Sequence, residues 1–213
     1  DMYYDPKRMH FGMLRVINDD TISGGMGFGT HPHDNMEIIT IPLEGTLEHK
    51  DSMGHVQDIC PGEVQVMSAG TGITHSEYNP DQHVPVNLFQ IWVIPDQQDV
   101  KPRYDQQCFD FDGKRNSFIQ LVHPRDEETG VGLWINQRAW FFIGTFDKEF
   151  KMEYTLRNPE NGIYAMVIEG VFTVEGQILG RRDGLGLWDI DTIHLIAETP
   201  GARILLIDIP MRM

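Results

Sequence analysis

The chain has 213 residues, of which 40% are hydrophobic and 23% charged, a composition typical of a globular protein with one large or two small β domains. Its 32 acidic residues against 17 Lys and Arg give a formal net charge of −15, which argues against direct binding to nucleic acids or anionic membranes. Two cysteines without C-x-x-C spacing, no apolar run of membrane-spanning length and no signal peptide predict a cytoplasmic protein without a disulfide framework.

Short apolar runs separated by Gly, Pro, Asn and Asp recur along the chain, whereas long helical periodicity is not found. Runs of this kind predict β-strands arranged in a sandwich or barrel. The clearest strand candidates, in chain order, are Leu14–Ile17, Met36–Leu43, Val64–Met67, Leu88–Ile94, Ile163–Ile168, Val171–Val174 and Arg203–Ile209.

The two halves of the chain repeat each other weakly. A Glu-Gly turn flanked by apolar strand residues occurs at Gly45 and again at Gly170, 170 − 45 = 125 residues later, and each is followed by another turn glycine and strand. The pattern predicts two copies of one small barrel, 1–110 and 111–213, joined within the polar stretch 96–115. The alternative is a chance match between two strand-turn-strand segments.

Side chains of metal-ligand type form two i, i+2 pairs in the first half. Residues two apart in a strand point to the same face, so His31 and His33 would aim at one point, as would His75 and Glu77. Glu37 has the same parity as His33 if that strand continues unbroken. Imidazoles with one carboxylate and no thiolate suit Fe, Mn, Ni, Cu or Zn. Spacing alone does not choose between Glu37 and Glu77.

A single H-x-H pair is a weak signal, because most histidines in β proteins lie at the surface or form structural hydrogen bonds. Two separate pairs, each preceded by glycines, are much harder to obtain by chance. Five further histidines lack such a partner pattern, and we assign them structural or surface positions: His49, His55, His83, His123 and His194.

A family resemblance is carried by the same segments. Gly25, His31, His33 and Glu37 match the first cupin motif, G(x)5HxH(x)3–4E(x)6G, with Gly45 displaced by one position. The second motif is matched loosely by Gly62, Gly70, His75 and Asn79. More specifically, the segments 28–33, 43–45 and 67–80 resemble the pirin family, and above all the bacterial pirin-like quercetinases. The resemblance implies an all-β bicupin fold of two tandem jelly-roll barrels.

In that family the ligands are three histidines and the glutamate two positions after the last of them. The resemblance therefore implies that His31, His33, His75 and Glu77 hold one divalent metal, with Glu37 close by but outside the coordination sphere. Iron is the metal expected, and Zn, Ni, Cu or Mn are alternatives. Family members usually begin with a further segment, so we expect a native N-terminal strand ahead of Asp1.

The second barrel can be compared with the first by counting from the two turn glycines. Counting back from them, the positions equivalent to His31 and His33 are Leu156 and Asn158, and Gly162 replaces Glu37. Counting forward 13 residues from the turn glycine that follows, as from Gly62 to His75, Ala197 falls where His75 would be. The count predicts that 111–213 has lost the ligand set and that each chain binds one metal.

The function that the resemblance implies is a metal-dependent dioxygenase of the quercetin 2,3-dioxygenase type. Its substrates would be a flavonol and O2, its products would include CO, and Glu77 would be the catalytic base for the 3-hydroxyl. The alternative is a non-enzymatic metal-containing redox sensor or transcription cofactor, acting through a protein partner that the sequence does not reveal. A different cupin activity, such as an isomerase or an oxalate-type enzyme, is a third reading.

Overall fold

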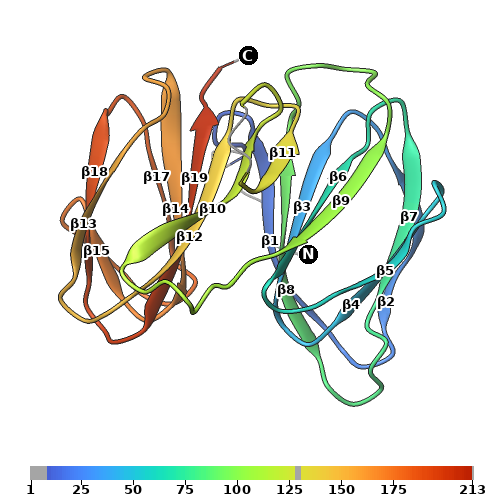
Figure 1. Ribbon diagram of the computed structural model, residues 1–213, viewed down its shortest axis with the longest axis horizontal. Helices are drawn as coiled ribbons and strands as arrows, with labels where there is room; N and C mark the ends of the chain where they lie inside the picture. Colours follow the sequence, from blue (N-terminus) through green and yellow to red (C-terminus); the bar gives the residue numbers. More distant parts are fainter. Residues whose placement is uncertain (1–8, 128–130, 213) are drawn as a thin grey trace. The chain divides into compact units, whose positions relative to one another are not determined.

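The computed structural model describes residues 9–127 and 131–212, and its regular elements within these ranges are all β-strands. The expected all-β class is therefore confirmed. None of the described residues form a helix able to span a membrane. The chain divides into two compact units, an N-terminal unit of Leu14–Phe109 with Leu133–Gln137, and a C-terminal unit of Asp110–Gly132 and Arg138–Met213 with the residues up to Met13. Figure 1 shows each unit as layered antiparallel strands.

The described strands of the N-terminal unit are β1 (Leu14–Ile22), β2 (Gly27–His33), β3 (Glu37–Glu44), β4 (Leu47–Asp51), β5 (Val56–Ile59), β6 (Glu63–Ser68), β7 (Ile73–Tyr78), β8 (Val86–Val93), β9 (Arg103–Cys108) and β11 (Leu133–Ile135). Those of the C-terminal unit are β10 (Ser117–Pro124), β12 (Trp140–Phe146), β13 (Lys151–Thr155), β14 (Asn161–Glu169), β15 (Phe172–Val174), β16 (Gln177–Leu179), β17 (Gly184–Leu187), β18 (Thr192–Ala197) and β19 (Ala202–Pro210).

The two units share one strand order. In the N-terminal unit the sheets run β1-β8-β3-β6-β9 and β2-β7-β4-β5. In the C-terminal unit the corresponding orders are β12-β19-β14-β17, with β10 beside β12, and β13-β18-β15-β16. The smaller sheets correspond strand for strand, and in the larger sheets β1, β8, β3 and β6 correspond to β12, β19, β14 and β17, whereas β9 and β10 have no counterpart. This correspondence explains the weak internal repeat in the sequence, because each copy needs the same turns at the same places.

The paired turn glycines have the same backbone geometry. Gly45, between β3 and β4, has φ +74°, and Gly170, between β14 and β15, has φ +78°. A side chain at Gly45 would also lie 2.7 Å from the carbonyl oxygen of Pro85, and one at Gly170 would lie 2.4 Å from Oγ1 of Thr199. Both positions therefore require glycine for conformation and for space.

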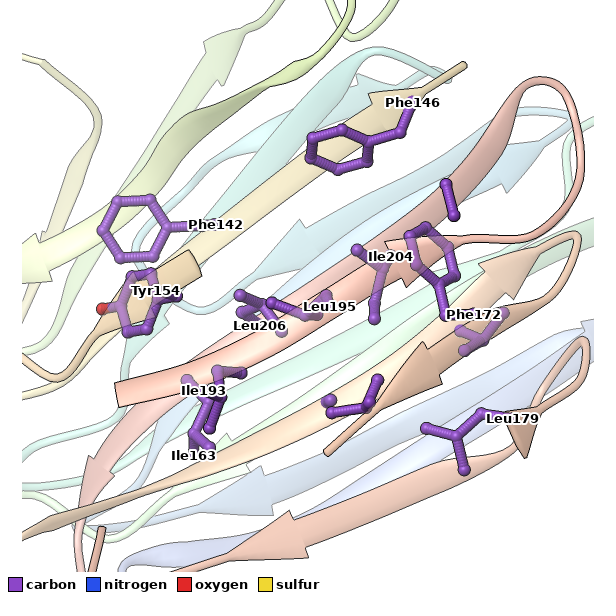
Figure 2. Close-up of a cluster of buried hydrophobic side chains, with 14 of the residues drawn as sticks. Phe142, Phe146, Tyr154, Ile163, Phe172, Leu179, Ile193, Leu195, Ile204 and Leu206 are labelled. Carbon is purple, nitrogen blue, oxygen red and sulfur yellow. The ribbon is translucent and has the colours of Figure 1, made fainter. Parts of the chain in front are cut away.

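Alternation of apolar and polar residues places a hydrophobic core inside each unit. The C-terminal core is rich in aromatic rings: Phe142 and Tyr154 lie 5.3 Å apart between ring centroids, and Phe146 and Phe172 lie 6.1 Å apart (Figure 2). Such edge-to-face and tilted pairs add to the free energy gained from burying the rings.

Candidate metal centre

The two histidine-bearing strands, β2 and β7, are direct neighbours in the smaller sheet of the N-terminal unit. They pair antiparallel, and a register shift between Phe28 and His31 sets His31 opposite His75. Cross-strand partners share a face of the sheet, so the i, i+2 pairs of both strands converge. His31 and His33 are half-buried, whereas His75 and Glu77 are only 1% and 2% exposed.

The three imidazoles of this cluster lie ring to ring. Centroid separations are 4.4 Å for His31 and His75 and 4.9 Å both for His31 and His33 and for His33 and His75. One ligand-type nitrogen from each ring lies within 4.8 Å of the other two. Nitrogens that each lie about 2 Å from one ion are at most about 4 Å apart. Small rotations of the three rings would therefore bring all three nitrogens onto one transition-metal ion.

Glu77 approaches the cluster from the same strand as His75. It falls into a second group of ligand-type atoms, within 4.8 Å of one another, with His75 and His49. Its Oε2 accepts a hydrogen bond of 2.8 Å from the side-chain amide of Gln90, which in turn accepts one of 3.0 Å from the indole N–H of Trp92. This chain of donors fixes the carboxylate and leaves Oε1 free.

Two buried atoms of the cluster have no hydrogen-bond partner among the residues that the structure describes. They are Nε2 of His75 and Oε1 of Glu77. Buried polar atoms are seldom left unsatisfied, because each costs the free energy of removing it from water. A nitrogen and a carboxylate oxygen are both ligands that a transition metal accepts, and the two atoms belong to residues that the sequence pairs. The donor set therefore fits a bound metal ion.

Burial and neighbouring imidazoles favour the neutral ring at two of these histidines, His33 and His75, as coordination of a metal requires. Burial and the neighbouring His31 lower the pKa of His33 to about 4, and the same two causes lower the pKa of His75 to about 3. Burial raises the pKa of Glu77 to about 7, although the hydrogen bond from Gln90 opposes the rise. A cation in the cluster would reverse that rise by stabilising the ionised carboxylate.

Hydrogen bonding also determines which ring nitrogen of His31 is available to bind a metal. Its Nδ1 lies 2.8 Å from the carbonyl oxygen of Gly29, which can only accept, so Nδ1 carries the proton. In the neutral ring the lone pair is then on Nε2. This orientation of a ligand ring by a carbonyl is common around metal sites.

Glu37, the other carboxylate with matching parity, has a different environment. β2 ends at His33 and β3 begins at Glu37, with Asn35 between them in the left-handed conformation at φ +44°. The unbroken strand that the parity argument required is therefore not present. Both Glu37 oxygens are engaged, Oε2 by Ser68 and Oε1 by Asn136, each at 2.8 Å. Its carboxylate ties β3 to β6 and to the segment after β11.

The structure places one histidine at the cluster that the sequence pattern did not single out. His49, on β4, is fully buried and its Cα is paired with that of Glu77. The available signal was Asp51, a further ligand-type residue two positions after it. Of the remaining histidines assigned structural or surface positions, His83 and His194 are exposed, His55 is half-buried and His123 is buried.

In the C-terminal unit, the positions equivalent to the ligands carry no such cluster. Leu156 and Ala197 are buried in the hydrophobic core, and the ligand groups found among the described residues all lie in the N-terminal unit.

Comparisons with known proteins agree with this architecture. The pirin family model matches residues 1–93, and a model described as the quercetinase C-terminal cupin domain matches residues 121–209. The chain is 43% identical over 209 residues to a quercetin 2,3-dioxygenase of Escherichia coli, covering 98% of this chain and 87% of that protein. The chain belongs to the pirin family.

Further pirin-family relatives extend the comparison to solved structures. A pirin-like protein of Caulobacter vibrioides is 35% identical over 206 residues, covering 97% of this chain and 87% of that protein. The bacterial pirin YhhW of Escherichia coli, solved in complex with nickel(II), superposes with a TM-score of 0.90 at 40% identity, covering 99% of this chain and 88% of that one. The expected bicupin fold is confirmed.

Proposed function

We propose that this pirin-family protein is a metal-dependent dioxygenase that opens a flavonol such as quercetin with O2 and releases CO. The observation that supports it most is the pair of unpartnered buried atoms, Nε2 of His75 and Oε1 of Glu77, beside the imidazoles of His31 and His33. Relatives that the chain matches over almost its full length are named quercetin 2,3-dioxygenase.

In this proposal His31, His33, His75 and Glu77 hold one divalent metal per chain. The site lies in the N-terminal barrel, 1–110, and the C-terminal barrel, 111–213, is structural. Iron is the native metal we propose, although the nickel complex of a relative illustrates that such sites accept other first-row metals. When bound, the metal supplies a Lewis acid and a template for the deprotonated 3-hydroxyl of the flavonol.

Glu77 is the residue we assign to the proton of that hydroxyl. It is the carboxylate of the proposed ligand set, and general-base catalysis requires a group that can take a proton and give it up again. Gln90 holds Oε2, so Oε1 is the oxygen that would take the proton, once Glu77 has swung off the metal. Without a metal, burial raises the pKa of Glu77 to about 7, and a bound cation would lower it again, so that Glu77 would be ionised and able to accept the proton.

The test is an assay of O2 consumption, flavonol loss and CO release by metal-loaded protein. The proposal predicts all three for the wild type, and loss of all three in His75→Ala and Glu77→Ala. His83→Ala, a change at an exposed histidine, is the matched control and should behave as wild type. Turnover that survives in both site variants would contradict the assigned site. A metal-loaded protein that turns over no flavonol, yet captures a protein partner only in one oxidation state, would support the regulatory alternative.

A further inference from the structure

His49 occupies a buried position between the metal cluster and the surface. Its Nδ1 lies 3.4 Å from Nδ1 of His75, and its Nε2 lies 3.4 Å from Oδ2 of Asp51. Asp51 is itself buried, and its Oδ2 is also 2.8 Å from Nδ1 of His55, a half-buried side chain. The ring of Tyr104 lies beside both imidazoles, with its centroid 5.0 Å from that of His49 and 4.8 Å from that of His55.

The chemistry of these groups determines where the protons lie. Burial and the hydrogen bonds that Asp51 accepts act in opposite directions on its pKa, and the net effect lowers that pKa, so Asp51 is an ionised acceptor. Nε2 of His49 must then donate to it. With its proton on Nε2, the neutral ring of His49 carries the lone pair on Nδ1, the atom that faces His75. Nδ1 of His75 therefore donates to His49, which leaves the lone pair of His75 on Nε2.

That nitrogen is one of the two unpartnered buried atoms of the site. We propose that His49 is a positioning residue for the metal centre: by accepting the Nδ1 proton of His75, with Asp51 accepting its own, it holds His75 in the tautomer and orientation that present Nε2 to the metal. The inference rests on the metal site proposed above. It assigns His49 no contact with the metal and no part in the flavonol chemistry.

Geometry favours this role over direct coordination by His49. Its Nδ1 is the nitrogen that faces His75, and its Nε2 faces Asp51, so both ring nitrogens are already engaged. The partner of a ligand histidine is generally a carboxylate, a carbonyl or a water. Here the partner of His75 is the neutral imidazole of His49, which in turn donates a hydrogen bond to the carboxylate of Asp51.

The test compares metal affinity among variants that keep a side chain of similar size. His49→Phe removes both hydrogen bonds, and we expect the affinity for Zn²⁺ or Co²⁺, measured by competition with a chromophoric chelator, to fall about 10- to 100-fold. His49→Gln offers an oxygen acceptor and an N–H donor, so it should recover part of the loss. Lys50→Gln, on the neighbouring exposed position of β4, is the control and should bind as wild type.

If His49 had only a structural role, His49→Phe would lower the melting temperature of the metal-free protein without changing the tautomer of His75. Nitrogen-15 NMR of the histidine rings, recorded with and without Zn²⁺, separates the two. The proposal predicts protonated Nδ1 on His75 and unprotonated Nδ1 on His49 in both states, and loss of the single His75 tautomer in His49→Phe. It is overturned if His75 binds Zn²⁺ through Nδ1, if His49 coordinates, or if His49→Phe keeps wild-type affinity.

These outcomes are distinct from those that test the dioxygenase. A wild-type protein that binds metal with the predicted tautomers but consumes no O2 with any flavonol contradicts the proposed function and leaves the role of His49 standing. Wild-type turnover combined with unchanged metal affinity in His49→Phe contradicts the role of His49 and leaves the proposed function standing. A wild-type protein that binds none of these metals contradicts both.

Discussion

Gln90 donates its side-chain amide to Oε2 of Glu77 over 2.8 Å, and both residues are buried. The indole N–H of Trp92 donates to the amide oxygen of Gln90, which fixes the amide with its N–H₂ toward the carboxylate. The ring centroids of Trp92 and His33 lie 4.9 Å apart, with the two ring planes nearly perpendicular. Two of the proposed ligands, Glu77 and His33, are thus held by side chains of one strand, β8.

Removing the donor should weaken metal binding. In Gln90→Leu, Glu77 loses the hydrogen bond that orients it, and we expect metal affinity to fall about 10- to 100-fold. Trp92→Phe keeps an aromatic ring beside His33 but no N–H, so its effect should be in the same direction and smaller. Chelator competition measures both, with Gln57→Leu at an exposed position of β5 as the control. Equal affinity in Gln90→Leu and the wild type would show that Glu77 needs no orienting partner.

The two candidate glutamates should respond oppositely to amide substitution. Glu37→Gln places an N–H₂ group against one of the two donors, Ser68 or Asn136, and should lower the free energy of unfolding by about 1–3 kcal/mol while metal affinity is retained. Glu77→Gln should lose metal affinity and leave the metal-free protein at least as stable, since it removes a buried carboxyl group whose pKa burial raises.

Denaturant unfolding of the metal-free proteins, followed by metal titration, measures both quantities. A Glu37→Gln variant that keeps its stability but no longer binds metal would move Glu37 into the coordination sphere and contradict the assignment of Glu77.

Removal of the metal should lower stability without abolishing the fold. At a free metal concentration 100 times the dissociation constant, binding to the native state alone contributes about 2.7 kcal/mol. Chelation should therefore lower the melting temperature while the β-sheet circular dichroism remains. Elemental analysis should find one metal per wild-type chain and almost none in His75→Ala. Two metals per chain would indicate that the C-terminal barrel retains a site.

A buried carboxylate stabilises the C-terminal unit in a different way. Asp208 accepts hydrogen bonds from the hydroxyl of Tyr154, the backbone N–H of Arg157 and the amide of Asn161, at 2.6 to 2.7 Å. Asp208→Asn leaves one of these donors facing an N–H₂ group, so we expect a loss of about 1–3 kcal/mol in the free energy of unfolding. Urea denaturation measures it, with exposed Asp191→Asn as the control. Metal affinity should be unchanged, and a marked loss of affinity would contradict a purely structural C-terminal barrel.

Much of the cluster can be predicted from sequence because strand periodicity is local. His31 with His33, and His75 with Glu77, face one way whatever the rest of the chain does. The register between the strands is not local: the irregularity between Phe28 and His31 sets which residues of β2 and β7 are opposite one another, and no spacing rule contains it.

The same distinction explains what the sequence does not reveal. Glu37 keeps the parity of the ligands, but the left-handed Asn35 ends the strand before it and sends its carboxylate to Ser68 and Asn136. His49 reaches His75 because β4 pairs with β7, a contact between distant segments. Its i, i+2 partner Asp51 is the one local sign of its role.

CO release from a flavonol by the metal-loaded protein, compared between the wild type and His75→Ala, tests the central claim most directly. We expect CO to appear in proportion to O2 consumed and flavonol lost in the wild type, and no CO from His75→Ala, whose metal-free fold should be intact by circular dichroism. Equal CO release by the two proteins, or none from fully metal-loaded wild type across a flavonol panel, would contradict a dioxygenase built on this metal centre.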